Sequence, residues 1–166
     1  MTHGGTSSRG VADPTIEAMG AERGADILLV EDNPDHAQFT LKALADHKAV
    51  GRTFWVKDGQ EALDYLHRRN QWADAARSPR PGLILLDINL PKVSGHEVLR
   101  DIKSSVALRS IPVVMLTTSD RPEEVVATYR AGANSYVKKP VKFGQYIEHI
   151  KLLKDYWTLT SLLPPD

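Results

Sequence analysis

The run Leu83–Leu86 is aliphatic throughout, is followed at once by Asp87, and stops at Pro91. A short apolar run without polar alternation is typical of a strand that is buried on both faces, as in a parallel sheet covered by helices. Ligand sites in such sheets lie beyond the carboxyl ends of the strands, where Asp87 falls. Taken alone, Asp87 could equally cap a turn. Its role therefore depends on what the other strands bring to the same edge.

Similar short apolar runs alternate with helical patterns along most of the chain. The expected strands are 26–30, 53–56, 83–87, 111–116 and 135–138. The expected helices lie around 34–47, 62–66 and 98–102, from Pro122 to Gly132 with Ser119 or Asp120 as the cap, and from 141 to 162. Residues 70–81 are expected to form a loop insertion. Five strands that alternate with five helices predict an open, doubly wound α/β domain with a parallel sheet.

The composition is that of one globular domain. The chain has 166 residues, a formal net charge of +0 and no cysteine, so we expect no nucleic-acid partner, no disulfide and no thiolate metal site. No apolar run reaches the roughly 20 residues that span a bilayer, and the N-terminus lacks the apolar core of a signal peptide. We therefore expect a soluble, cytoplasmic protein that does not bind a membrane.

Three segments are expected along the chain. Residues 1–24 are rich in Gly, Ser, Thr and Ala without an apolar period, which predicts a flexible leader with a short stretch of helix at 15–19. The folded domain is expected at 25–154. Residues 155–166 are expected to extend the last helix and end in a tail.

Polar side chains follow four of the five strands. Glu31 and Asp32 follow the first strand, Asp87 the third, Thr117 the fourth and Lys139 the fifth. If the strands are parallel, these residues meet at one edge of the sheet. Three close carboxylates repel one another unless a cation joins them, and hard oxygen ligands without His or Cys favour Mg²⁺. Acid, divalent ion, hydroxyl and ammonium together suit phosphoryl transfer, with Asp87 as the nucleophile.

From about residue 25 to residue 154, these motifs resemble the receiver domain of bacterial two-component response regulators. The resemblance implies a flavodoxin-like sheet with strand order 2-1-3-4-5 and a phosphohistidine on a sensor histidine kinase as the donor. It also implies a cis Lys139–Pro140 bond. Carried over by motif position, the implied roles are metal binding by Glu31, Asp32, Asp87 and the backbone carbonyl of Asn89, phosphoacceptance by Asp87, a turn at Gly95, switching by Thr117 and Tyr136, and phosphate contact by Lys139.

The last predicted helix carries more apolar surface than one core-facing stripe requires. This surface could fold back on its own domain, but we favour a homodimer built from the fourth helix, the fifth strand and the fifth helix. The tail also resembles that of stand-alone regulators that partner phytochrome-type kinases, which implies a bacteriophytochrome as the kinase. The expected interface residues are Tyr146, Tyr156, Trp157 and Leu159.

Two other functions compete with a phosphorylated signalling module. One is an aspartyl-phosphate hydrolase of the haloacid dehalogenase type, although such enzymes usually carry a DxD motif after the first strand, where this chain has Glu31-Asp32-Asn33-Pro34. The other is a pseudo-receiver that acts as a scaffold without phosphorylation. We favour a single-domain regulator that catalyses only its own phosphorylation and dephosphorylation, and that signals through protein contacts because no DNA-binding module follows residue 154.

Overall fold

The computed structural model describes residues 24–45, 50–160 and 163. The predicted leader, with its helix at 15–19, therefore lies outside the described residues except for Gly24. The strands are β1 (Ala25–Val30), β2 (Val50–Val56), β3 (Leu83–Asp87), β4 (Val113–Thr117) and β5 (Ser135–Lys138). The helices are α2 (Pro34–Ala45), α3 (Gly59–Leu66), α4 (Gly95–Ser104), α5 (Pro122–Arg130) and α6 (Phe143–Asp155), with short helical turns η1 (Asn70–Trp72) and η2 (Tyr156–Thr160).

The five strands form one sheet in the order β2-β1-β3-β4-β5, and every neighbouring pair is parallel. The predicted fold class is thus confirmed. β4 begins at Val113, later than predicted, because Pro112 has no backbone N–H to donate to a neighbouring strand. The Pro112 carbonyl still accepts a hydrogen bond from the Ile84 N–H at 3.0 Å, so the chain is aligned with the sheet one residue before the strand starts.

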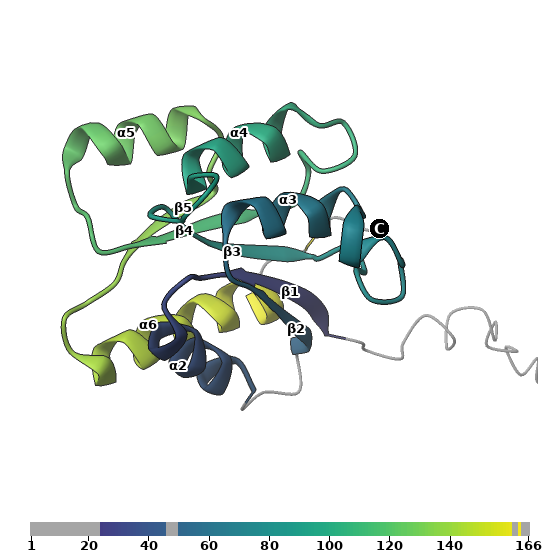
Figure 1. The fold of residues 1–166 in the computed structure, drawn as a ribbon. Coiled ribbons are helices and arrows are strands. Elements are labelled where there is room, and N and C mark those ends of the chain that lie inside the picture. Colours follow the sequence, from purple (N-terminus) through teal and green to yellow (C-terminus); the bar gives the residue numbers. More distant parts are fainter. Residues whose placement is uncertain (1–23, 46–49, 161–162, 164–166) are drawn as a thin grey trace, which may run out of the picture.

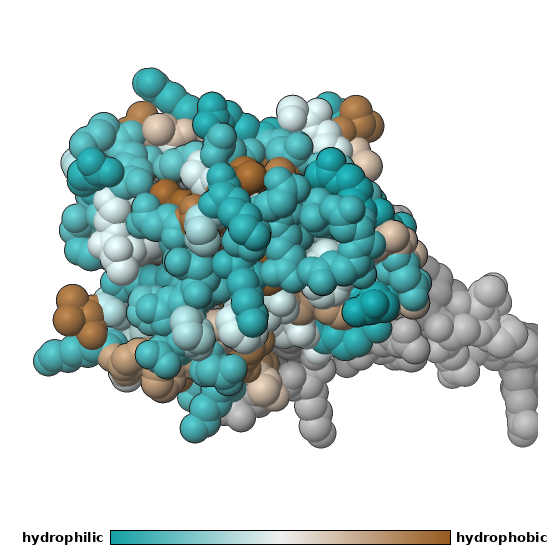
Figure 2. Space-filling model, viewed as in Figure 1, coloured by the Kyte–Doolittle hydropathy of each residue, from teal (hydrophilic) through white to brown (hydrophobic). Residues whose placement is uncertain are grey.

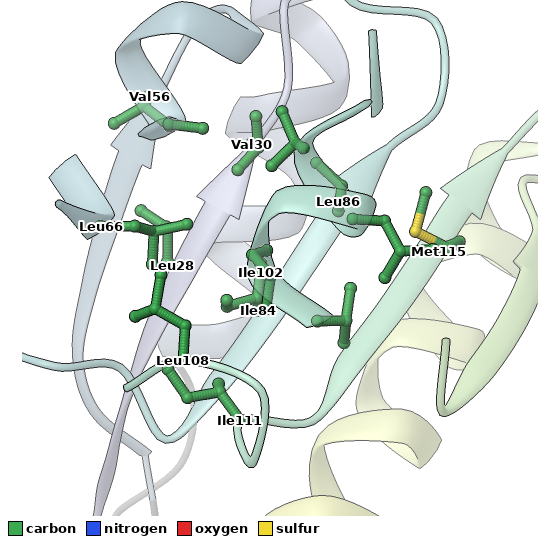
Figure 3. Close-up of a cluster of buried hydrophobic side chains, with 14 of the residues drawn as sticks. Leu28, Val30, Val56, Leu66, Ile84, Leu86, Ile102, Leu108, Ile111 and Met115 are labelled. Carbon is green, nitrogen blue, oxygen red and sulfur yellow. The ribbon is translucent and has the colours of Figure 1, made fainter. Parts of the chain in front are cut away.

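Helices cover both faces of the sheet, with α3, α4 and α5 on one side and α2 and α6 on the other (Figure 1). Successive strand residues point to opposite faces, so Leu28 and Ile84 pack under α3 and α4 whereas Ile27 and Leu83 pack against α2 and α6. Figure 3 shows the first of these two apolar clusters, with side chains from the central strands and from α4. The unbroken aliphatic runs are explained by this burial on both faces.

The helix termini agree only in part with the sequence prediction. α4 begins with a capping box, in which Ser94 and Glu97 exchange side-chain-to-backbone hydrogen bonds. The predicted cap of α5 was wrong, because Arg121 occupies the cap position without a side-chain bond. Ser119 instead accepts from the Arg121 N–H at 3.4 Å, which forms a turn before the helix. Gly132, just past the end of α5, has φ +102°, as expected for a left-handed helix terminus.

The last helix is shorter than the predicted 141–162. The regular α-helix covers 13 residues, from Phe143 to Asp155, and continues as a wider π-type turn over Tyr156–Thr160. Thr158 donates its hydroxyl to the Lys154 carbonyl at 2.7 Å, an acceptor that an α-helix would offer to the backbone N–H of residue 158. Such side-chain competition favours departure from α-helical geometry.

The face of the molecule that Figure 2 shows is mostly hydrophilic, with a few separate apolar side chains. The insertion at 70–81 is anchored to the domain: Tyr65 donates to the Pro79 carbonyl at 2.9 Å, and buried Ser78 donates to the Trp72 carbonyl at 2.7 Å. No helix in the described ranges is long and apolar enough to cross a membrane.

Candidate phosphoryl-transfer site

Three carboxylates meet at the carboxyl ends of two adjacent central strands. Glu31 and Asp32 follow β1, and Asp87 ends β3, which pairs with β1. One oxygen from each of the three lies within 4.8 Å of the others. The Glu31 side chain is fully buried and that of Asp87 is 10% exposed, whereas Asp32 lies at the surface. The cluster is therefore reached from solvent on the Asp32 side.

Lys139 reaches this cluster from the far edge of the sheet. It follows β5, and its backbone N–H donates to the Thr117 carbonyl at 2.6 Å, so the chain after β5 is held against the end of β4. Its ammonium donates to Asp87 Oδ2 at 2.8 Å and also to Glu31 Oε2. Its side chain is only 5% exposed. The prediction of a cis Lys139–Pro140 bond is wrong, because no peptide bond in the described residues is cis. The lysine contacts both acids with a trans bond.

Burial and charge shift the protonation of these groups. Burial, followed by the charge of Asp87, raises the pKa of Glu31 to about 7 despite the opposing effect of Lys139. Burial alone would lower the pKa of Lys139, but the charges of Asp87 and Glu31 outweigh it and raise that pKa above its ordinary value. One ammonium is thus shared between two buried acids, and the cluster still has excess negative charge to attract a cation.

The loop after Asp87 folds back tightly against the strand. The Asn89 N–H donates to Asp87 Oδ1 at 3.0 Å, and the Gly95 N–H donates to the Ile88 carbonyl at 2.9 Å. A Cβ atom at Gly95 would lie 2.1 Å from the Asp87 carbonyl oxygen, which no side chain can tolerate without backbone movement. The glycine predicted from the motif is therefore required by close packing.

Thr117 and Tyr136 are connected through Ser119. Thr117 is fully buried at the end of β4, and its hydroxyl oxygen accepts from the Ser119 N–H at 3.1 Å. The Tyr136 hydroxyl donates to the Ser119 carbonyl at 3.0 Å. The ring of Tyr136 is half-buried and packs against the cluster under α3, α4 and α5. Ser119 therefore forms hydrogen bonds with both Thr117 and Tyr136.

Two contacts to the site were not predicted from the sequence. His36 Nδ1 lies 3.3 Å from the Lys139 ammonium, and Trp55 donates its indole N–H to the Glu31 carbonyl at 2.8 Å. A signal for His36 existed, because it is the fourth residue after Asp32 in the first turn of α2 and so lies at the same edge of the sheet. Trp55 offered no comparable signal, because its contact depends on the pairing of β2 with β1.

The expected dimer residues differ in their surroundings. Tyr146 is 3% exposed and shares a 2.7 Å hydrogen bond with buried Thr40, so it belongs to the packing of α6 on α2 and not to an interface. Tyr156 is 54% exposed and Trp157 is half-buried. Both line a cavity of about 520 Å³ beside edge strand β5. The side chain of Leu159 lies outside the described part of the chain.

Comparison with known proteins gives consistent results. A family model described as the response regulator receiver domain matches residues 27–151. The chain is 43% identical over 131 residues to a probable methanogenesis regulatory protein, FilR2, of Methanothrix harundinacea, covering 79% of this chain and 82% of the relative. The phosphorylated cyanobacterial phytochrome response regulator RcpA superimposes with a TM-score of 0.80 at 38% identity, over 86% of this chain and 99% of that one. The Mn²⁺-bound response regulator Rcp1 of Synechocystis also gives 0.80, at 35% identity, over 85% and 99%.

Proposed function

Because the chain belongs to the response regulator receiver family, we propose that it accepts a phosphoryl group on Asp87 and signals through contacts with other proteins. The observation that carries this proposal is the ion pair between Asp87 and buried Lys139, next to the acids Glu31 and Asp32. A carboxylate can form an acyl phosphate. Here the nucleophile, a fixed ammonium and a cluster of acids lie at one edge of the sheet.

The acidic cluster suits a divalent cation. Its three oxygens lie close enough to share one ion, and carboxylates are the ligands that Mg²⁺ prefers. Glu31, Asp32 and Asp87 would hold it, with the backbone carbonyl of Asn89, a surface residue, as a fourth ligand. Bound Mg²⁺ would supply positive charge to the phosphoryl oxygens. The related Rcp1 has been solved with Mn²⁺, which supports a divalent ion in this family.

The remaining residues have distinct roles in this proposal. Asp87 attacks phosphorus, so that a new P–O bond forms as the bond to the donor's leaving group breaks and its electron pair departs with that group. Lys139 keeps its protons and neutralises charge on the phosphoryl oxygens. The Thr117 hydroxyl turns toward the new phosphoryl group, which disturbs its bond with Ser119. Tyr136, bonded to the same Ser119, then changes position on the surface of β5.

The test is phosphorylation in solution with a small donor. Acetyl phosphate and Mg²⁺ should label the wild type stoichiometrically, detected as a mass increase of one phosphoryl group, and should not label Asp87→Asn. Undiminished labelling of Asp87→Asn would contradict the assignment. Multiple turnover of a phosphate ester would favour a hydrolase instead, and partner binding that is independent of Mg²⁺ and of Asp87 would favour a scaffold.

A sensor histidine kinase of the phytochrome type is the proposed donor. This is supported by the similarity to RcpA, whose structure is that of a cyanobacterial phytochrome response regulator. A phosphotransfer screen against the histidine kinases of the source organism tests the proposal. Faster transfer from a bacteriophytochrome than from the other kinases is the expected result, and preference for an unrelated kinase would contradict it.

A homodimer through α5, β5 and α6 is the proposed assembly. β5 is an edge strand, and next to it Leu152 and Tyr156 are 67% and 54% exposed. Sedimentation of Trp157→Ala should show a weaker dimer than the wild type at matched concentration. Val106→Ala, which removes a side chain that is 80% exposed between α4 and β4, serves as the control. A wild type that is monomeric at high micromolar concentration would contradict the dimer.

A further inference from the structure

His36 contacts the reactive centre but has no part in the proposed acceptor, metal or switch groups. Its Nδ1 lies 3.3 Å from the Lys139 ammonium. An ammonium group can only donate, so Nδ1 accepts and the ring proton is on Nε2. Burial and the charge of Lys139 lower the pKa of His36, in agreement with a neutral ring. His36 is therefore a hydrogen-bond acceptor for Lys139.

The Lys139 ammonium has three N–H groups, and it contacts three acceptors among the described residues. These are Asp87 Oδ2, Glu31 Oε2 and His36 Nδ1. Two of the three acceptors are carboxylates that a cation and a phosphoryl group would occupy. Neither the cation nor the phosphoryl group would bind His36, so its Nδ1 stays available to Lys139. Since the Lys139 side chain is only 5% exposed, water cannot readily replace a lost partner.

The imidazole of His36 is held in a defined position. The backbone N–H of His36 donates to Asn33 Oδ1 at 3.2 Å, and the His36 carbonyl accepts from the Thr40 hydroxyl at 2.8 Å. The ring packs edge-on against Phe143, with centroids 6.4 Å apart, and lies 6.3 Å from the ring of Tyr146. An acceptor that is fixed in advance loses little entropy when it binds the ammonium.

We propose that His36 is a positioning residue for Lys139, and that its Nδ1 keeps the ammonium beside Asp87 when the carboxylates are taken up by a cation and a phosphoryl group. This inference rests on the proposed phosphorylation of Asp87. No proton passes to or from His36 during the transfer. The P–O bond to Asp87 forms and the bond to the leaving group breaks, while Lys139 remains protonated and His36 remains neutral.

The first test compares three substitutions of His36. Asn places an amide oxygen near the position of Nδ1, Gln places its amide nearer Nε2, and Ala removes the acceptor. A hydrogen bond to a charged group contributes enough that its loss should slow labelling about tenfold. At saturating Mg²⁺ and acetyl phosphate we expect labelling of His36→Ala, and also of His36→Gln, to be slowed by about this factor. His36→Asn should stay within about twofold of the wild type, because its acceptor is retained.

The second test is a double-mutant cycle that reads Mg²⁺ binding instead of labelling. Mg²⁺ competes with Lys139 for the carboxylates of Glu31 and Asp87, so loss of the alternative acceptor of Lys139 should raise the dissociation constant of Mg²⁺ several-fold in His36→Ala. In a Lys139→Met background there is no ammonium to displace, and His36→Ala should have no further effect. Isothermal calorimetry measures the four constants, and thermal unfolding confirms that each variant is folded.

The outcomes separate this inference from the proposed function. Failure of the wild type to bind Mg²⁺ or to be labelled on Asp87 would overturn both. Normal behaviour of the wild type would leave the proposed function intact. In that case, two results would overturn the role of His36 alone. One is an equal effect of His36→Ala on Mg²⁺ binding in the wild type and in Lys139→Met. The other is labelling of His36→Asn that is as slow as that of His36→Ala.

Discussion

Glu31 has no exposed side-chain surface and lies against Lys139, so its ionisation is linked to folding. Burial and the charge of Asp87 raise its pKa from 4.5 to about 7. The folded state then binds this proton more tightly than the unfolded state between those two values. The contribution of Glu31 to stability is therefore greatest below pH 4.5 and is lost as the pH rises through 7.

Between pH 5 and pH 8 we expect the ionisation of Glu31 to lower the free energy of unfolding of the Mg²⁺-free protein by about 2–3 kcal/mol. Glu31→Gln cannot ionise and should show a smaller fall. Urea denaturation at the two pH values measures the difference, and Glu123→Gln, an exposed acid in α5, is the control. An unchanged pH dependence in Glu31→Gln would contradict the linkage.

The residues of the site were predictable to the extent that they follow strands. Asp87 and Lys139 were placed correctly because parallel strands bring their carboxyl ends to one edge. His36 and Trp55 were missed, because their contacts depend on helix rotation and on strand register. Tyr146 was assigned to the wrong environment, since helical spacing alone does not say which of two apolar faces meets the sheet.

The loop from β3 to α4 tolerates no side chain at Gly95. A Cβ atom there would lie 2.1 Å from the Asp87 carbonyl oxygen and 2.7 Å from the Ile88 Cα. Gly95→Ala must therefore move backbone, and we expect a loss of about 1–3 kcal/mol in unfolding free energy. Labelling of Asp87 should also slow, because the loop that donates to its carboxylate is displaced.

Gly144 provides a matched control in α6. A Cβ atom there would meet nothing within 4 Å, and alanine is the better helix former. Gly144→Ala should be neutral or stabilising by up to about 1 kcal/mol. Denaturant unfolding and acetyl phosphate labelling compare the two variants. If Gly95→Ala were as stable and as readily labelled as Gly144→Ala, the close packing at Asp87 would be contradicted.

Helices α2 and α6 are joined by a buried hydroxyl pair. The Thr40 hydroxyl donates to the His36 carbonyl at 2.8 Å, which leaves its oxygen to accept from Tyr146 at 2.7 Å. Tyr146→Phe removes this donor and should cost about 1 kcal/mol in urea denaturation. Tyr156→Phe, at an exposed ring, should change stability little. Equal effects of the two substitutions would show that the pair does not join the helices.

The types of the elements followed from periodicity, whereas their ends did not. The aliphatic runs predicted β1, β3 and β4, because burial on both faces removes polar residues from these strands. The end of the last α-helix was missed because Thr158 bonds the Lys154 carbonyl through its side chain. The cap of α5 was missed because Ser119 forms a turn with Arg121. Such local competition between side chain and backbone leaves no trace in hydrophobic spacing.

The sheet order β2-β1-β3-β4-β5 leaves both faces covered by helices and places the acids that follow β1 beside the acid that ends β3. The site is thus held in the folded state and absent from the unfolded chain. A ligand that binds the folded state alone must stabilise it. Mg²⁺ at the proposed site should therefore stabilise the domain.

Thermal unfolding with increasing Mg²⁺ measures this stabilisation. At a concentration one hundred times its dissociation constant, Mg²⁺ should stabilise the protein by about 2.7 kcal/mol, which corresponds to a rise of about 5–10 °C in Tm for a domain of this size. Asp32→Asn should lose most of this rise, because the surface ligand becomes neutral. Glu123→Gln should keep it, since that acid lies on α5 outside the cluster. An equal rise in both variants, at constant ionic strength, would place the stabilising ion elsewhere than at the three carboxylates.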